Sequence, residues 1–321
     1  MKSNERVFCF YEIKVNVKTE SGNPGKVVTI KDVFEKFSLI DKEDYHPRRL
    51  GSKQIFGIDD FILKEKSVEI LFYRSDLEES PPSVRDHITE EIRELERNET
   101  EGNSYSSHAV IIFNDENKKI PALMLIEQCK GIGPARIESI LRQIFRKYKK
   151  VDKNYFLQNK IGDFKDASGQ YIKESVAYDF EIKGIPSDTF ISDLNNGELT
   201  LFELIKDGSM VETFDEESYF EEKEAVIKLQ VADKNSLGNG RFQQVMRILN
   251  VWKNDYSKAR LRIKPRNANE YTIDWESNSG FSEEYVKRVT VKPFSPPLKS
   301  SYKKIYRPIM DRMNSEAQKN A

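Results

Sequence analysis

Residues 108–129 read HAVIIFNDENKKIPALMLIEQC, and residues 134–150 read PARIESILRQIFRKYKK. The first stretch holds two apolar runs separated by the polar sequence NDENKK, which is typical of two strands joined by a turn. In the second stretch the apolar residues recur at helical spacing, and Pro134 suits a first helical turn. These apolar residues are Ile137, Ile140, Leu141, Ile144, Phe145 and Tyr148. The block predicts two strands followed by an amphipathic helix, as in an α+β fold.

The same patterns extend outward on both sides of this block. Strands are expected at residues 7–17, twice within 53–74, and at 174–185, 225–232, 257–266 and 269–275. Helices are expected at 28–38, 80–98 and 238–252, and we expect the basic tail after 295–297 to end in a helix. The mixture favours mixed or antiparallel sheets packed against helices.

The length of 321 residues is typical of two domains. The charged stretch 149–170 has no sustained period, so we place the domain boundary there. This predicts an N-terminal α+β domain over 1–150, a linker over 151–173, and a C-terminal α+β domain over 174–321 that carries a basic strand and a basic tail.

Composition excludes several classes of protein. The chain is 38% hydrophobic and 33% charged, with a mean hydropathy of −0.66, yet 19 Phe and 14 Tyr are too many for a disordered chain. No apolar run reaches the ~18 residues of a membrane span. Two cysteines and three histidines, without zinc spacing, predict neither a disulfide framework nor a metal site. We expect a cytoplasmic protein with reduced thiols and no cofactor.

Charge is strongly segregated along the chain although the net charge is −1. Residues 241–312 hold 16 Lys and Arg against 7 Asp and Glu, and residues 130–150 hold seven bases against one acid. Acidic residues concentrate in 76–101 and in 203–224. Such local excesses of positive charge are typical of surfaces that bind polyanions.

The strongest signal is the sequence SKARLRIKPR at 257–266. Its bases alternate with Ala259, Leu261 and Ile263, so a strand places them on one face, ~6.6–7 Å apart. These bases are Lys258, Arg260, Arg262, Lys264 and Arg266. Such a row suits nucleic-acid phosphates, because neutralised phosphates release their counterions. The alternative is a solvated face that pairs with the acidic segment 203–224.

A second cluster lies at the end of the predicted helix 134–150. Its bases are Arg142, Arg146, Lys149 and Lys150, at positions i, i+4, i+7 and i+8. Their spacing places them largely opposite the apolar stripe, where they are available to phosphates. The alternative is structural, because bases in the last turn also stabilise the helix dipole.

Two short motifs suggest other chemistry. CKGIGPARIESIL at 129–141 looks like the hairpin of a helix-hairpin-helix module, in which glycines and free N–H groups approach phosphate. A strand-to-helix turn without a ligand explains the same residues. The sequences YEIK (11–14) and FEIK (180–183) contain the Glu-x-Lys of metal-dependent nucleases, with Glu181 and Lys183 as candidates. An alternating surface strand is the simpler interpretation.

Three blocks of the sequence resemble the RexA type of prophage-encoded phage-exclusion proteins. They are SHAVIIFNDENKKIPALMLIEQCKGIGPARIESIL, VAYDFEIKGIP and FQQVMRILNVWKNDYSKARLRIKPR, and the likeness in order and character spans residues 7–270. The resemblance implies a dimeric two-domain α+β protein that binds double-stranded DNA without strong sequence preference. It also implies a sensor role in an abortive-infection system with a membrane effector as partner, and it transfers no catalytic residue.

These observations predict a non-enzymatic protein that binds double-stranded DNA through backbone contacts, as a homodimer in anti-phage defence. The contacts are expected from the nine bases of the strand 257–266 and of the helix end 142–150 named above. Two alternatives stay open. One is a metal-dependent nuclease built on a Glu-x-Lys strand, and the other is an interaction protein whose basic strand meets an acidic partner.

Overall fold

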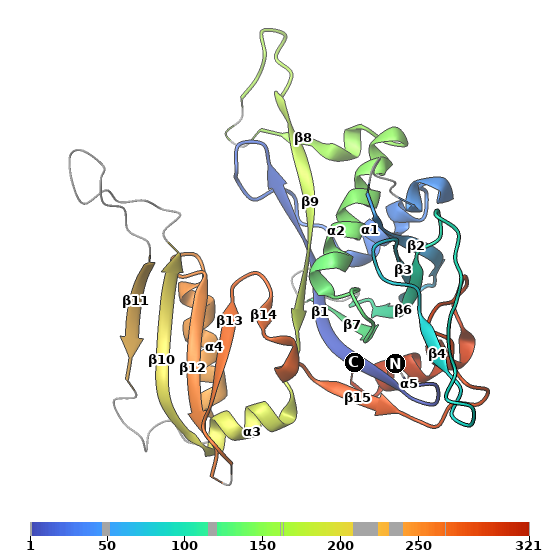
Figure 1. The fold of residues 1–321 in the computed structure, drawn as a ribbon. Helices are drawn as coiled ribbons and strands as arrows, with labels where there is room; N and C mark the ends of the chain where they lie inside the picture. Colours follow the sequence, from blue (N-terminus) through green and yellow to red (C-terminus); the bar gives the residue numbers. More distant parts are fainter. Residues whose placement is uncertain are drawn as a thin grey trace, which may run out of the picture. The chain divides into compact units, whose positions relative to one another are not determined.

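The computed structural model describes residues 2–46, 52–114, 121–160, 162, 164–207, 224–230, 240–266 and 268–320. The chain is a mixed α/β protein whose sheets are mostly antiparallel (Figure 1). Its contacts form two compact units, which are unit 1 (Met1–Ile182 with Val289–Ala321) and unit 2 (Lys183–Arg288). The stretch 151–173, expected to be a linker, lies inside unit 1, and the C-terminal residues return to unit 1.

Eight strands form the sheet of unit 1, in the order β2-β3-β6-β7-β1-β9-β8, with β15 paired to β1. Their bounds are β1 (Arg6–Thr19), β2 (Gln54–Leu63), β3 (Ser67–Asp76), β6 (Asn103–Ile112), β7 (Ala122–Glu127), β8 (Leu157–Asn159), β9 (Lys173–Gly184) and β15 (Arg288–Val291). The strands β6 and β7 are the antiparallel pair predicted from 108–129, with Ala109 opposite Ile126. The strand β6 begins at Asn103, five residues before the apolar run that starts at His108.

Helices cover both faces of this sheet. On one face lie α1 (Ile30–Phe37) and α2 (Pro134–Phe145), and their aromatic side chains meet around Phe37, whose ring centroid is 6.3 Å from that of Phe145. A capping box at Thr29 and Asp32 starts α1, and Pro134 starts α2 as predicted. On the other face lies α5 (Arg307–Gln318), the helix expected at the end of the basic tail.

A buried polar network fixes the C-terminal segment to the sheet. Arg6 Nε lies 2.6 Å from Glu127 Oε1, and the second carboxylate oxygen of Glu127 lies 2.6 Å from His108 Nδ1. The N–H of Tyr306 donates to His108 Nε2, and Arg307 pairs with Glu69 at 2.7 Å. These contacts pair charged groups that would otherwise be costly to bury. Part of the basic tail is therefore a structural clamp.

Unit 2 is one five-stranded antiparallel sheet, in the order β11-β10-β12-β13-β14, with two helices. The strands are β10 (Glu198–Asp207), β11 (Glu224–Leu229), β12 (Lys258–Lys264), β13 (Tyr271–Glu276) and β14 (Gly280–Phe281), and the helices are α3 (Asp188–Asn196) and α4 (Arg241–Trp252). The helices bury Phe190, Leu194 and Leu249 against the sheet. Trp252, the last residue of α4, is 44% exposed.

Single-turn helices complete the described elements. They are η1 (Lys42–Tyr45), η2 (Arg146–Lys150), η3 (Asn154–Phe156) and η5 (Glu283–Tyr285). No described helix has both the length and the apolar character needed to cross a membrane.

The helix predicted over 80–98 is wrong. These residues form a projecting hairpin whose strands are β4 (Ser83–Arg85) and β5 (Ile92–Glu94), with Val84 opposite Arg93 (Figure 1). The carboxylate of Asp86 accepts the N–H groups of Ile88 and Thr89, which competes with helical hydrogen bonding. The apolar stripe that suggested a helix is exposed. We call residues 80–101 the acidic arm.

Candidate nucleic-acid interface

The basic strand has the alternation that its sequence predicts. Along β12, Ala259, Leu261 and Ile263 are buried in the core of unit 2. The side chains of Arg260, Arg262, Lys264 and Arg266 are exposed, and that of Lys258 is half-buried. The cations of β12 therefore share the face of the sheet that the two helices leave open, whereas Arg266 lies beyond the end of the strand.

Carboxylates on the neighbouring strands neutralise part of this row. Arg260 Nε lies 3.0 Å from Asp274 Oδ1 on β13, and Arg260 Nη1 lies 4.0 Å from Glu203 Oε2 on β10. Lys228 on β11 approaches the same Glu203 carboxylate at 3.3 Å. The four side chains form a charge ladder across four strands, with alternating sign. This is the pairing that the alternative interpretation expected for Glu203, while residues 208–223 of that segment lie outside the described residues.

Two more arginines of the row are engaged in hydrogen bonds. Arg262 Nε donates to Thr272 Oγ1 at 3.4 Å, and Arg266 Nε donates to the carbonyl of Asn196 at 3.1 Å. These contacts fix the Nε side of Arg262 against β13 and that of Arg266 against the end of α3, and each uses one of the five guanidinium N–H groups. The strand β12 is therefore a weaker candidate than its sequence alone suggests.

The second predicted cluster lies where α2 changes to the tighter helix η2. Arg142 lies in the last turn of α2 and pairs with Asp179 of β9, while Arg146 and Lys149 on η2 are exposed. Lys149 lies 5.1 Å above the ring of Phe156, and Lys150 pairs with Asp44 at 2.7 Å. The helix η2 (Arg146–Lys150) is a 3₁₀ helix with about three residues per turn. Its basic side chains therefore point in different directions around the helix axis.

A hairpin next to this helix end adds cations that the sequence analysis assigned to a linker. The strand β8 pairs with β9, and the ladder continues outward as the bridge between Lys165 and Tyr171. Its turn is well defined, because Asp166 accepts hydrogen bonds from Ser168 and Gln170 and Gly169 has a φ of +80°. The serine hydroxyl and these backbone N–H groups lower the pKa of Asp166.

The hairpin also exposes two aromatic rings beside its lysines. Phe164 is 51% exposed and Tyr171 is 46% exposed. Lys160 Nζ lies 5.3 Å from the Phe164 ring centroid, and Lys165 Nζ lies 5.0 Å from that of Tyr171. Cations stacked on exposed rings offer both a charged and an apolar contact to a nucleic acid.

Together the helix end and the hairpin form one continuous stretch of unit 1, residues 142–173, which we call the basic segment. It holds nine Lys and Arg against three Asp. Seven of its bases are exposed, namely Arg146, Lys149, Lys150, Lys153, Lys160, Lys165 and Lys173. Apart from the bond between Lys150 and Asp44, none of these seven makes an ion pair with a described residue.

The Glu-x-Lys motifs occupy neighbouring strands. Lys14 of the first motif, on β1, lies 3.1 Å from Glu181 of the second, on β9, and Asn16 donates to the same carboxylate at 2.6 Å. Burial raises the pKa of nearby Glu138, which accepts the N–H of Ile182. No group of three or more His, Cys, Asp and Glu side chains among the described residues is arranged to hold a metal ion. The pairing within this cluster is that of a structural salt bridge.

The GIG sequence forms a turn between a strand and a helix. It follows β7, so the helix that a helix-hairpin-helix module needs before the hairpin is a strand instead. Gly131 has a φ of +73° and packs against Arg74. Burial, reinforced by the charge of Glu127, raises the pKa of the Cys129 thiol to about 12, which is opposite to the lowering that a helix N-terminus would give.

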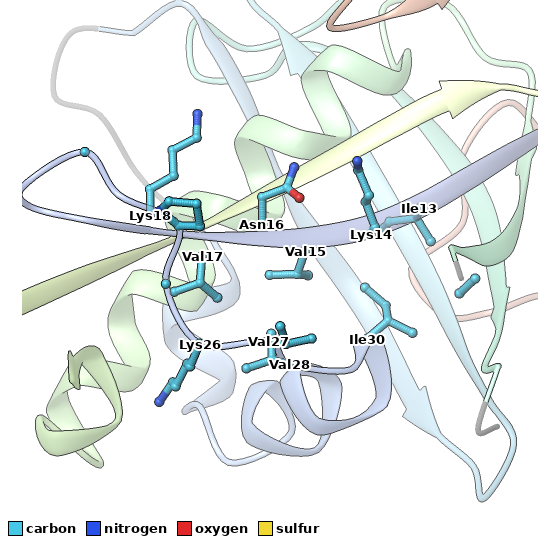
Figure 2. A pocket seen from close by; sticks show the side chains of 14 residues that line it. Ile13, Lys14, Val15, Asn16, Val17, Lys18, Lys26, Val27, Val28 and Ile30 are labelled. Carbon is cyan, nitrogen blue, oxygen red and sulfur yellow. The ribbon is translucent and has the colours of Figure 1, made fainter. Parts of the chain in front are cut away.

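One hollow of about 500 Å³ lies where β1 continues beyond its partner β7. Figure 2 shows Val15 and Val17 turned toward Val27 and Val28, while Asn16 and Lys18 point to the other side of the strand. Gly25 makes this packing possible, because a Cβ there would lie 2.6 Å from Val17. Apolar side chains and the three lysines Lys14, Lys18 and Lys26 line the hollow, and its lining residues include no acid.

Comparison with known proteins gives no relative for this chain. No family model, no curated protein and no solved structure matches it.

Proposed function

We propose that the protein binds double-stranded DNA without enzymatic action, through backbone contacts made mainly by the basic segment. The observation that carries this proposal is the set of seven exposed bases around the end of α2 and along the β8–β9 hairpin. Asp44 and Asp179 are the carboxylates that pair with bases of this segment among the described residues. Its positive charge is thus less compensated than that of β12.

Counterion release supplies the driving force for such binding. Each base that neutralises a phosphate releases part of the condensed cation atmosphere of the duplex, so affinity falls steeply as salt rises. Lysines and arginines that contact phosphates fix position without reading sequence. We therefore expect little sequence preference. Phe164 and Tyr171 add contacts that do not depend on salt.

The basic strand β12 has a subordinate role in this proposal. Arg260 is matched by Asp274 and Glu203, so its contribution to the local potential is small. Of the five bases, Lys258, Lys264 and Arg266 remain candidates for additional phosphate contacts. Arg260 and Arg262 are exposed arginines whose Nε groups contact Asp274 and Thr272, so they form the control for the basic segment.

The biological setting is proposed from the resemblance to RexA-type proteins. It assigns the chain to the cytoplasm as a sensor that binds DNA and forms a homodimer, with a membrane protein as effector.

The experiment is an equilibrium titration of a labelled 30-base-pair duplex with three proteins. These are the wild type, the variant Arg146→Ala/Lys149→Ala and the control variant Arg260→Ala/Arg262→Ala. We expect the first variant to bind at least several-fold more weakly than the wild type, and the control to bind within about twofold of it. If the control loses affinity and the first variant does not, the site lies on β12. If the wild type does not bind, the proposed function is wrong.

A further inference from the structure

The acidic arm is an ordered ribbon. The strands β4 and β5 are paired, and Asp86 closes the turn by accepting the N–H groups of Ile88 at 2.7 Å and Thr89 at 3.0 Å. These backbone bonds lower the pKa of Asp86. At the base, Arg97 donates to the carbonyl of Leu77. A pre-formed ribbon loses less conformational entropy on docking than a flexible loop does.

The surface of the arm combines negative charge with exposed apolar side chains. It holds seven acidic residues and three arginines, and none of its carboxylates makes an ion pair with a described residue. Ile88 at the tip is 92% exposed and Ile92 is 59% exposed. Val84 and Leu95 are exposed as well. Exposed apolar side chains on a projecting ribbon are typical of an interaction surface.

The basic segment has the complementary composition. It carries nine bases against three acids, and it exposes Val151, Phe164, Tyr171 and Ile172 between its cations. Both charge and apolar character therefore match between the arm and the segment. Charge complementarity of this kind favours the correct partner and speeds association.

We propose that the acidic arm of one copy docks on the basic segment of a second copy and competes there with nucleic acid. This inference rests on the proposed function only in naming the competitor, since the docking itself needs no DNA. The carboxylates of the arm take the place of phosphates, and its isoleucines contact the exposed rings and aliphatic side chains of the hairpin.

The partner is a second copy because the arm and the segment of one chain lie apart within unit 1. The arm projects from the strands β3 and β6, whereas the segment surrounds α2 and the β8–β9 hairpin, toward the opposite end of the unit (Figure 1). No described residue of the arm hydrogen-bonds to the segment. Two copies related by a two-fold axis can form this contact twice, which closes the assembly as a dimer.

Substitutions that reverse charges in the arm and in the segment test whether the two surfaces dock. The arm variant is Glu90→Lys/Glu91→Lys, and the segment variant is Arg146→Glu/Lys149→Glu; all four positions are exposed. Sedimentation velocity at about 50 μM in low salt is expected to show dimers for the wild type and monomers for each variant alone. An equimolar mixture of the two variants is expected to form a heterodimer, because the unchanged arm of one variant then faces the unchanged segment of the other, and the replaced residues of the second contact meet with opposite sign. Circular dichroism verifies that both variants are folded.

Several outcomes contradict the docking. They are a monomeric wild type, variants that dimerise as the wild type does, and a mixture that stays monomeric. The duplex titration is independent of these outcomes, so a dimer without DNA binding rejects the proposed function and keeps the docking. Competition is measured by adding duplex to the wild-type dimer, which we expect to dissociate. A dimer that binds duplex without dissociating rejects the competition.

Discussion

Arg260 on β12 and Asp274 on β13 face each other across the sheet of unit 2, with 3.0 Å between Nε and Oδ1. This pair, extended by Glu203 and Lys228, converts a row of cations in the sequence into a surface of alternating charge. The relationship moves the favoured nucleic-acid contacts from unit 2 to the basic segment of unit 1.

The Arg260–Asp274 pair is expected to contribute little to stability. Both side chains are substantially exposed, and pairs of this kind are worth about 0.2–1 kcal/mol. A double-mutant cycle with Arg260→Ala and Asp274→Ala, measured by urea unfolding, gives the coupling energy directly. A coupling well above 1 kcal/mol contradicts this account of the ladder.

The aromatic rings of the hairpin are expected to add affinity that salt does not remove. Replacing Phe164 and Tyr171 by alanine is expected to weaken duplex binding by about 1 kcal/mol or more, while the salt dependence stays that of the wild type. The measurement is the duplex titration repeated at three salt concentrations. A changed salt dependence with unchanged affinity argues that the rings only position their lysines.

The buried contacts of Glu127 are expected to contribute strongly to the free energy of unfolding. Glu127 lies between Arg6 and His108, each 2.6 Å away, and all three side chains are almost fully buried. The variant Glu127→Gln leaves Arg6 as an uncompensated buried charge, which costs about 3–5 kcal/mol. Chemical denaturation measures the loss, and Lys150→Ala, which breaks an exposed pair, is the matched control. Equal losses in both variants contradict the assignment.

The carboxylate of Glu79, at the base of the acidic arm, is expected to make the free energy of unfolding depend on pH. Burial alone raises its pKa, but hydrogen bonds from Lys130, Tyr105 and Asn103 and the charge of Arg74 together lower the pKa to about 2. Because the folded-state pKa is below the ordinary value of 4.5, this stabilisation is present above pH 4.5 and is lost as pH falls toward 2.

The test of this titration compares the wild type with Glu79→Gln in thermal unfolding at pH 7 and at pH 3. The variant is expected to be roughly 1–2 kcal/mol less stable at pH 7, and the difference is expected to shrink at pH 3. A difference that is the same at both pH values shows that the carboxylate charge is not responsible.

Local sequence patterns predict much of the secondary structure, but they do not predict which side chains become partners in the folded protein. The β6–β7–α2 block and the alternation along β12 follow from local periodicity, which the chain itself contains. Asp274 and Glu203 become partners of Arg260 only through strand pairing, which no local pattern discloses. The helix predicted for the acidic arm is wrong for a different reason. Its helical stripe is real, but Asp86 fixes a turn and no packed surface receives the stripe.

The basic segment could have been recognised in part. Its bases are visible in the sequence, but the absence of a period over 149–170 indicated a linker. The stretch GDFKDASGQYIK contains a turn sequence, DASGQ, between aromatic and basic residues, and this pattern is typical of a hairpin. Pairing of Lys165 with Tyr171 in the structure bears that pattern out.

The most direct test of the central claim is the salt dependence of duplex binding. Affinity is measured between about 50 and 200 mM salt for the wild type, for Arg146→Ala/Lys149→Ala and for Arg260→Ala/Arg262→Ala. We expect log affinity to fall linearly with log salt, with a slope smaller by about 2 in the first variant and unchanged in the second. An unchanged slope in the first variant, or a reduced slope confined to the second, contradicts the claim that the basic segment holds the phosphates.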